Sequence, residues 1–243
     1  MLKNCLRAVY HAIGPSSMRR YYRNYGLAQE AKNFRREIAA IENVDNLLAR
    51  VIGTGQFQSN QKTMEIAGLL HLLGSMRPQR LCEIGAYHGG TLALFAHVAA
   101  PSAKLLSIDV HYPWHLRRAY SNLAGPRQHI KAIRGDSHSP RTQSKVAAWL
   151  DGAMLDFLFI DGDHSLEGVT LDYEMYGKFV RPGGIIAFHD IVPDYHARFG
   201  ITTRADVGQV PAFWNTLRRE YPQAIELVED PAQDGYGIGV LRR

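Results

Sequence analysis

Acidic and histidine side chains recur directly after short apolar segments in this chain of 243 residues. The residues that share this position are Glu83, Asp109, Asp136, Asp161, Asp163, His164, His189 and Asp190. Carboxylates and imidazoles are the groups that proteins use to move protons and to bind divalent cations. Their repeated place after apolar segments therefore indicates one site that combines several of them.

A glycine-rich segment, residues 85–90, follows the first of these apolar segments and could cradle a nucleotide cofactor. The dinucleotide-binding fingerprint needs glycine at its first, third and sixth places, but the third place counted from Gly85 is Tyr87. Glu83 could accept hydrogen bonds from the ammonium group of a zwitterionic cofactor, whereas it would repel a diphosphate. Asp109 lies 24 residues after Gly85, a spacing typical of a carboxylate that accepts both ribose hydroxyls. The segment favours a cofactor other than a dinucleotide.

The elements that must position these residues alternate along the chain. Short apolar segments predict strands, and segments of 10–15 residues with helical spacing predict helices. The predicted strands are 80–84, 104–108, 129–134, 155–160, 185–188, 224–228 and 236–241. The predicted helices are 62–74, 91–99, 114–123, 139–150, 166–179 and 209–220. This alternation predicts an α/β fold with a doubly wound, mostly parallel seven-stranded sheet, in which ligands bind at the carboxyl ends of the strands.

We expect two parts, a basic helical N-terminal extension over residues 1–57 and a catalytic domain over residues 58–243. Helical spacing of apolar residues predicts a first helix from Leu2 to Ile13 and a second over residues 27–50. An apolar stripe on such an extension suits a homo-oligomer contact or packing on the body of the protein. A basic helix lying on an anionic membrane surface is the alternative.

The charge of the chain is unevenly distributed. Residues 1–25 hold five Lys and Arg and no acid, so they carry all of the net charge of +5 and leave the remaining 218 residues neutral. A neutral body argues against a nucleic-acid substrate. No apolar run is long enough to span a membrane, and two cysteines cannot build a disulfide framework. These features predict a cytoplasmic protein, with residues 1–25 as a possible peripheral membrane contact.

From residue 58 onward the chain resembles the class I S-adenosylmethionine-dependent methyltransferases, whose fold is Rossmann-like. The resemblance rests on the segment Glu83–Thr91, on Asp109, on Gly135-Asp136-Ser137 and on the Pro182-Gly183-Gly184 turn. It implies that S-adenosylmethionine is the cofactor and that Asp109 binds its ribose. The other cofactor-binding residues that it implies are Glu83, Gly85, Ala86, Tyr87, Gly89, Thr91, Asp136, Ser137 and Asp161.

The segments 159–165 and 187–191 are similar to a narrower branch, the metal-dependent O-methyltransferases that tailor sugars and aromatic rings and include macrocin O-methyltransferase. This resemblance implies a divalent metal held by Asp161, His189 and Asp190, although the adjacent pair is usually acidic in the family. Carboxylates suit Mg²⁺ or Mn²⁺, and an imidazole favours Mn²⁺. A bound cation would lower the pKa of an acceptor hydroxyl.

A general base must reach the acceptor hydroxyl, and His164 is the first choice because the pKa of an unperturbed imidazole lies near neutral pH. Asp163 is the second choice. The long segment 191–208 is expected to form a lid or a wall of the acceptor site. We therefore expect methyl transfer to a hydroxyl of a small or glycosylated acceptor. The alternatives are a metal-independent methyltransferase acting on N, C or O and a non-catalytic cofactor-binding partner subunit.

Overall fold

A seven-stranded sheet forms the centre of the molecule. The computed structural model describes residues 16–53, 55–111 and 117–243. The strand order is β3-β2-β1-β4-β5-β7-β6; β7 runs antiparallel to both of its neighbours, and the other adjacent pairs are parallel. The strands are β1 (Arg80–Ile84), β2 (Lys104–Asp109), β3 (His129–Arg134), β4 (Leu155–Ile160), β5 (Val180–His189), β6 (Ile225–Leu227) and β7 (Ile238–Arg242). The predicted doubly wound, mostly parallel seven-stranded sheet is thereby confirmed.

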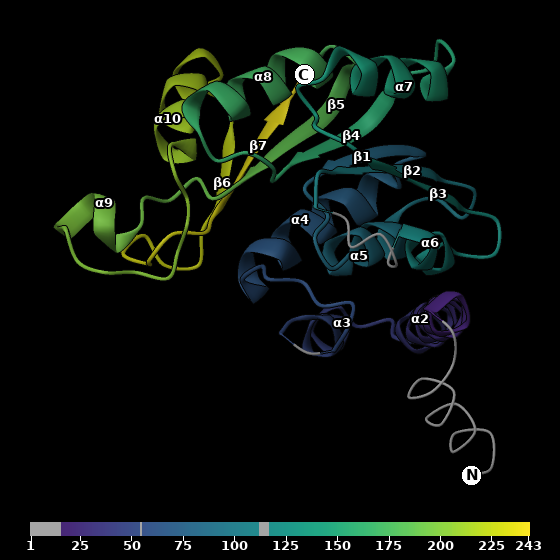
Figure 1. Ribbon diagram of the computed structural model, residues 1–243. Coiled ribbons are helices and arrows are strands. Elements are labelled where there is room, and N and C mark those ends of the chain that lie inside the picture. Colours follow the sequence, from purple (N-terminus) through teal and green to yellow (C-terminus); the bar gives the residue numbers. More distant parts are fainter. Residues whose placement is uncertain (1–15, 54, 112–116) are drawn as a thin grey trace.

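Helices cover both faces of the sheet (Figure 1). One face carries α7 (Pro140–Leu150), α8 (Leu166–Gly177) and α10 (Val210–Glu220). The other carries α4 (Thr63–Met76), α5 (Gly90–Val98) and α6 (Arg117–Tyr120), and the last is followed by a 3₁₀ turn, Ser121–Leu123. The short helix α9 (Tyr195–Phe199) lies apart from these layers, beyond the strand ends (Figure 1).

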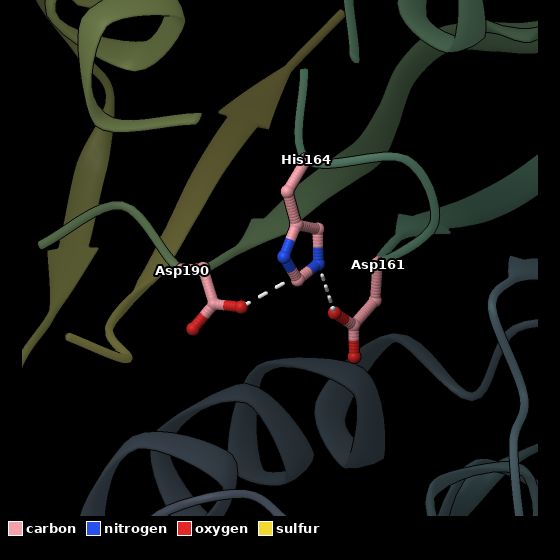
Figure 2. Close-up of side chains that lie close together, drawn as sticks. All are labelled: Asp161, His164 and Asp190. Atoms are coloured by element: carbon pink, nitrogen blue, oxygen red, sulfur yellow. Dashed lines mark ion pairs between the residues drawn. The ribbon is translucent and has the colours of Figure 1, made fainter. Parts of the chain in front are cut away.

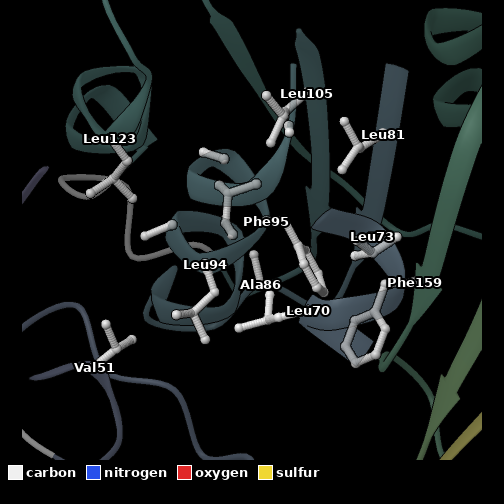
Figure 3. Close-up of a cluster of buried hydrophobic side chains, with 14 of the residues drawn as sticks. Val51, Leu70, Leu73, Leu81, Ala86, Leu94, Phe95, Leu105, Leu123 and Phe159 are labelled. Atoms are coloured by element: carbon white, nitrogen blue, oxygen red, sulfur yellow. The ribbon is translucent and has the colours of Figure 1, made fainter. Parts of the chain in front are cut away.

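The apolar residues of the strands form a core on each face of the sheet. In the core beneath α4 and α5, the ring of Phe95 contacts those of Phe157 and Phe159 edge to face, with centroids 5.0 and 5.2 Å away. Figure 3 shows Phe95 and Phe159 in this core. Full burial of each such ring contributes roughly 1.5–3 kcal/mol. Because both faces of β4 are covered, its sequence is apolar almost throughout, as expected for a central parallel strand.

The N-terminal region differs from its prediction. The single helix expected over residues 27–50 is wrong: α2 (Ser16–Ala39) and α3 (Val44–Val51) are separate helices. The break occurs because the side chain of Asn43 accepts the amide of Asn46 and so begins a new helix. The helix predicted at Leu2–Ile13 lies outside the described residues.

The buried faces of α2 and α3 belong to the same core as α4 and α5. The division of the chain at residue 57 stays a prediction, as do a homo-oligomer contact and a membrane contact of the basic segment. None of the helices described here has the length and apolar character to cross a membrane.

Three further expectations need correction. The helical spacing within residues 62–74 predicts an apolar stripe that includes Met64, but in α4 Met64 is 65% exposed, whereas the neighbouring Glu65 is buried. The turn expected at residues 181–184 lies within β5, where the register with β4 shifts. Of the helix expected at 114–123, residues 112–116 are outside the described part, and the remainder is α6 with its 3₁₀ turn.

The glycine-rich segment is packed tightly against other parts of the protein. A side chain at Gly85 would collide with the carbonyl oxygen of Asp161, and one at Gly90 would collide with the backbone of Gln58. At Gly89 an added Cβ would lie 2.6 Å from the ring of Tyr120. These three glycines are therefore required by the fold itself.

We expect Gly90→Ala to lower the free energy of unfolding by about 1–3 kcal/mol, because the new methyl group must displace rigid backbone. Gly74→Ala is the matched control: Gly74 lies in α4 with nothing near its missing Cβ, so alanine should stabilise the helix by about 0.5–1 kcal/mol. Urea unfolding of the two variants measures both effects. Equal stability of the two variants would contradict the packing argument.

Candidate active site

A cavity of about 860 Å³ opens at the carboxyl ends of the parallel strands. Most of the predicted site residues line it, namely Gly85, Tyr87, Asp109, Asp136, Ser137, Asp161, Asp163, His164, His189 and Asp190. Four do not: Glu83, Ala86, Gly89 and Thr91 are absent from its wall. The structure thus brings the strand ends together as predicted, and the volume lies in the upper part of the range of ligand pockets.

One half of the cavity is formed by the ends of β1, β2 and β3 and contains the carboxylates of Asp109 and Asp136. The carboxylate of Asp109 accepts the amide of Tyr87 at 2.8 Å and that of His111 at 2.6 Å. These bonds hold the carboxylate at the cavity wall, next to the glycine turn. The carboxylate of Asp136 likewise accepts the amide of His138 at 2.8 Å. Each carboxylate is thus fixed by the backbone that follows its strand.

The four predicted residues outside the wall are buried in the protein. Glu83 is buried on β1; burial raises the pKa of its carboxyl well above the ordinary value, and the charges of Asp161 and Asp109 raise it further. The hydroxyl of Thr91 is buried 2.9 Å from that of Ser59. Their assignment to cofactor binding stays a prediction.

The other half of the cavity contains four close side chains, Asp161, His164, His189 and Asp190, which we call the acid–histidine cluster. Nδ1 of His189 lies 3.1 Å from Oδ1 of Asp161 and 3.3 Å from Oδ2 of Asp190. Nε2 of His164 lies 3.6 Å from the same oxygen of each carboxylate. Figure 2 shows the imidazole of His164 between the two carboxylates. Two acids and two histidines thus share a space a few ångströms wide.

The charges in the cluster stabilise one another. Burial alone would raise the pKa of Asp161, but the neighbouring His189 and His164 hold it well below its ordinary value. The bond to Asp161 and the charge of Asp190 raise the pKa of His164 to about 9. Burial opposes protonation of His189, yet both carboxylates raise its pKa well above its ordinary value. The two carboxylates therefore favour the protonated form of both imidazoles.

The arrangement suits a metal, though through a different set of ligands from the predicted one. Asp161, His164 and Asp190 each offer a ligand atom, and these atoms all lie within 4.8 Å of one another. His189, the predicted third ligand, makes two close ion pairs, and its Nε2 is buried without a hydrogen-bond partner among the described residues. The role of His189 as a metal ligand stays a prediction. The converging ligand atoms belong instead to Asp161, His164 and Asp190.

Asp163, the second choice for a base, has a local structural role. Its carboxylate accepts the amide of Ser165 at 2.8 Å, which lowers its pKa. The hydroxyl of Ser165 in turn caps α8 by accepting the amide of Gly168 at 3.0 Å. The lowered pKa makes Asp163 a weaker base than an ordinary aspartate, although it lines the cavity.

Sequence reasoning missed Gln61, whose amide group donates to Oδ2 of Asp161 at 3.2 Å. Gln61 stands in the segment before α4, in a position that no strand-end pattern marks. Its contact with a residue 100 positions later has no local sequence signal. The bond fixes the orientation of the Asp161 carboxylate.

The sequence also gave no sign of the network that holds the far wall of the cavity. Buried Glu65 accepts the amide of Gly237 at 2.8 Å and the side-chain amide of Gln233 at 2.6 Å. Asp234, next along, accepts the amide of Tyr195 at 2.6 Å and the hydroxyl of Thr203. Residues 229–237 therefore tie the segment 191–208 to α4. We call residues 200–209 and 229–237 together the acceptor wall.

Comparison with known proteins finds a match for the central part of the chain. Residues 82–191 match the family model described as a methyltransferase domain. This part of the chain is similar to methyltransferase domains. The predicted enzyme class is confirmed for this part of the chain, which includes the glycine turn, Asp109 and the acid–histidine cluster.

Known proteins are similar to this chain in sequence or in structure. The uncharacterized protein R132 of Acanthamoeba polyphaga mimivirus is 29% identical over 120 residues, which are 44% of this chain, and the chain spans about half (49%) of that relative. The O-methyltransferase from Bacillus cereus in complex with S-adenosylhomocysteine superposes with a TM-score of 0.55 at 14% identity, over 100% of both chains. The MycE methyltransferase of the mycinamycin pathway has a TM-score of 0.55 at 18% identity, over 84% of this chain and 54% of its own. At such identities the likeness shows the fold.

One further carboxylate lies directly beneath the cavity. Asp172 of α8 is fully buried, and its Oδ1 lies 3.3 Å from Nε2 of His138, which lines the cavity. The same ring nitrogen is 3.1 Å from the carbonyl oxygen of Gly168. Burial raises the pKa of Asp172 to about 6. This carboxyl group therefore titrates in a range where most aspartates are fully ionised.

Asp172 should make the stability of the protein depend on pH. Because its pKa of about 6 in the folded state exceeds the ordinary 3.8, the folded state holds this proton more tightly than the unfolded chain. Stability therefore falls as the pH rises from about 4 to about 6, by at most about 3 kcal/mol, and stays lower above that range.

Asp172→Asn removes this titration, so its stability relative to the native protein should increase from pH 4 to pH 7 in urea unfolding. Glu174→Gln is the control, because Glu174 is exposed on the same helix. A constant difference between the Asp172 variant and the native protein across this range would refute the raised pKa.

Proposed function

We propose that the protein is an S-adenosylmethionine-dependent O-methyltransferase that acts on a hydroxyl group of a small or glycosylated acceptor. One observation carries the proposal: a single cavity joins the half that contains Asp109 to the acid–histidine cluster. The first half suits the cofactor, and the second suits the activation of an alcohol. The methyltransferase domain match over residues 82–191 supports the same assignment.

The residues of the first half fit the proposed cofactor. The Asp109 carboxylate, fixed by two amides, would accept the ribose hydroxyls, and Asp136 and Ser137 line the wall where the base would lie. A positively charged sulfonium is compatible with the six aspartates that line the cavity. The cofactor supplies an electrophilic methyl group, and the protein must hold the acceptor oxygen in line with it.

The acid–histidine cluster fits a divalent cation. Carboxylates are donors for Mn²⁺ or Mg²⁺, and ligand atoms of Asp161 and Asp190 lie within 4.8 Å of one another. These two side chains would hold the cation and leave Nε2 of His164 free to accept a proton. A bound cation would make an acceptor hydroxyl more acidic. The structure of MycE contains Mg, S-adenosylhomocysteine and mycinamycin VI, which supports a metal in a methyltransferase of this fold.

His164 would then accept the proton of the acceptor hydroxyl. Its pKa of about 9 is caused by the Asp161 and Asp190 carboxylates, so neutralisation of those charges would return the imidazole to its neutral form near pH 7. Nε2 is the atom that faces both carboxylates. The other ring nitrogen, Nδ1, is hydrogen-bonded to the carbonyl oxygen of Asp206, which fixes the ring in place.

A metal-independent methyltransferase is the second candidate, and the charge balance of the cluster favours it. Two protonated histidines neutralise Asp161 and Asp190 without any metal. In that case the imidazoles would orient the acceptor, and a raised pKa would make His164 a base only at alkaline pH. Binding of a divalent cation distinguishes the two candidates.

The cofactor assignment predicts binding of S-adenosylhomocysteine by isothermal titration calorimetry. Asp109→Asn should weaken this binding at least tenfold, because one of the carboxylate oxygens for the ribose is replaced by an amide donor. Asp151→Asn, in the left-handed position after α7, is the control and should bind normally. Absence of binding to the native protein at millimolar ligand would rule out the proposal.

The metal assignment predicts that the protein loaded with S-adenosylhomocysteine binds Mn²⁺ in a calorimetric titration. Asp190→Asn should weaken Mn²⁺ binding at least tenfold and leave S-adenosylhomocysteine binding unchanged. Asp206→Asn is the matched control, since Asp206 lines the same cavity outside the ligand set. Failure of the native protein to bind Mn²⁺ would favour the metal-independent candidate.

A further inference from the structure

The acceptor side of the cavity contains an arginine, Arg204, that has no acidic partner among the described residues. Six aspartates line the cavity, whereas Arg204 is the one Lys or Arg in its described wall. Within the part of the chain that the structure describes, Arg204 makes no ion pair with any carboxylate. Since no described carboxylate pairs with Arg204, its guanidinium is available to bind an anionic group of a ligand in the cavity.

The backbone that bears Arg204 is fixed on both sides. Before it, the hydroxyl of Thr203 bonds to the carboxylate of Asp234 and also accepts the amide of Ala205 at 3.0 Å. After it, the carbonyl oxygen of Asp206 bonds to Nδ1 of His164. Arg204 is thus held two residues from a direct contact with the acid–histidine cluster. An acceptor whose hydroxyl reaches the cluster could reach Arg204 with another group.

A second cation stands near the same wall. The ammonium group of Lys62 lies 5.7 Å from the ring centroid of Tyr236, which lines the cavity. A side chain at Gly235 would lie 2.7 Å from Cβ of Ala205, so the segment of Tyr236 packs beside that of Arg204. Arg204 and the ring of Tyr236 both line the cavity, and Lys62 stands against that ring. A guanidinium and an aromatic ring in one wall suit an anionic group on a ring or sugar.

We propose that the methyl acceptor carries an anionic group, a carboxylate or a phosphate, and that Arg204 binds it. The inference rests on the proposed function and defines its substrate class. A planar guanidinium can bind either anion through two parallel hydrogen bonds. Arg204 would neutralise the charge of the anion, and this contact would place the acceptor hydroxyl at His164. Arg204 is therefore a specificity residue of the acceptor wall.

Two matched pairs of probes test this inference by saturation-transfer NMR and calorimetry. The first pair is 3,4-dihydroxybenzoate and its neutral amide, and the second is glucose 6-phosphate and glucose. Each pair is titrated with and without S-adenosylhomocysteine, so that the result does not depend on the cofactor assignment. The proteins are the native chain, Arg204→Gln, Arg204→Lys and the control Arg219→Gln, whose residue lies on α10 outside this cavity.

The native protein and the Arg219 variant should bind the anionic member of at least one pair at least tenfold more tightly than the neutral member. Arg204→Gln should abolish this preference, and Arg204→Lys should retain part of it. Which pair shows the preference distinguishes a carboxylate from a phosphate. The inference is overturned if no probe binds, if neither pair shows a preference, or if the preference survives in Arg204→Gln.

Titration of S-adenosylhomocysteine separates the two proposals. Its affinity should be equal in the native protein and in Arg204→Gln. A tenfold loss in that variant would mean that Arg204 binds the carboxylate of the cofactor, and the acceptor inference would be wrong. Failure of the native protein to bind S-adenosylhomocysteine refutes the proposed function alone, because the anion preference is also read without it.

Discussion

The backbone contact between Gly85 and Asp161 is the constraint on which the site depends. The ends of the adjacent strands β1 and β4 approach so closely that no side chain fits at residue 85. The amide of Asp161 donates to the carbonyl of Ile84 at 2.9 Å and continues the ladder to the strand end. This contact sets the glycine turn directly beside a cluster carboxylate. The glycine turn and the acid–histidine cluster are therefore held in place by the ends of two adjacent, hydrogen-bonded strands.

The second constraint is electrostatic. Carboxylates gather at the strand ends because parallel strands end at one edge, and their mutual repulsion must be offset. Within the cluster, His164 and His189 supply the opposing charge. Deeper in the protein, burial opposes the ionisation of Glu83 and Asp172 and raises the pKa of each. The site thus has some carboxylates that are stabilised in the ionised form by histidines and others whose burial opposes ionisation.

The strand ends were predictable because each element carries its own pattern. The apolar run of β4 and the acids that follow it identify a central strand and its functional end. The reason for the glycines was not predictable, since Gly85 and Gly90 are required by backbone from residues 161 and 58. Glu65 was missed for the same reason: its partners lie 164–172 residues away. Local patterns predict elements and their ends, whereas long-range partners are decided only by the assembled fold.

The methyltransferase domain match includes the strand ends of the cavity and leaves out the acceptor wall. The match ends at residue 191, so it includes the half of the cavity that contains Asp109 and the acid–histidine cluster. The acceptor wall follows residue 191 in the chain. It is held by hydrogen bonds to Glu65, which precedes the matched segment. This wall is joined to the cluster by the hydrogen bond between His164 and the carbonyl oxygen of Asp206, so the position of His164 depends on a segment outside the match. Under the proposed function, the acceptor would contact both parts of the chain.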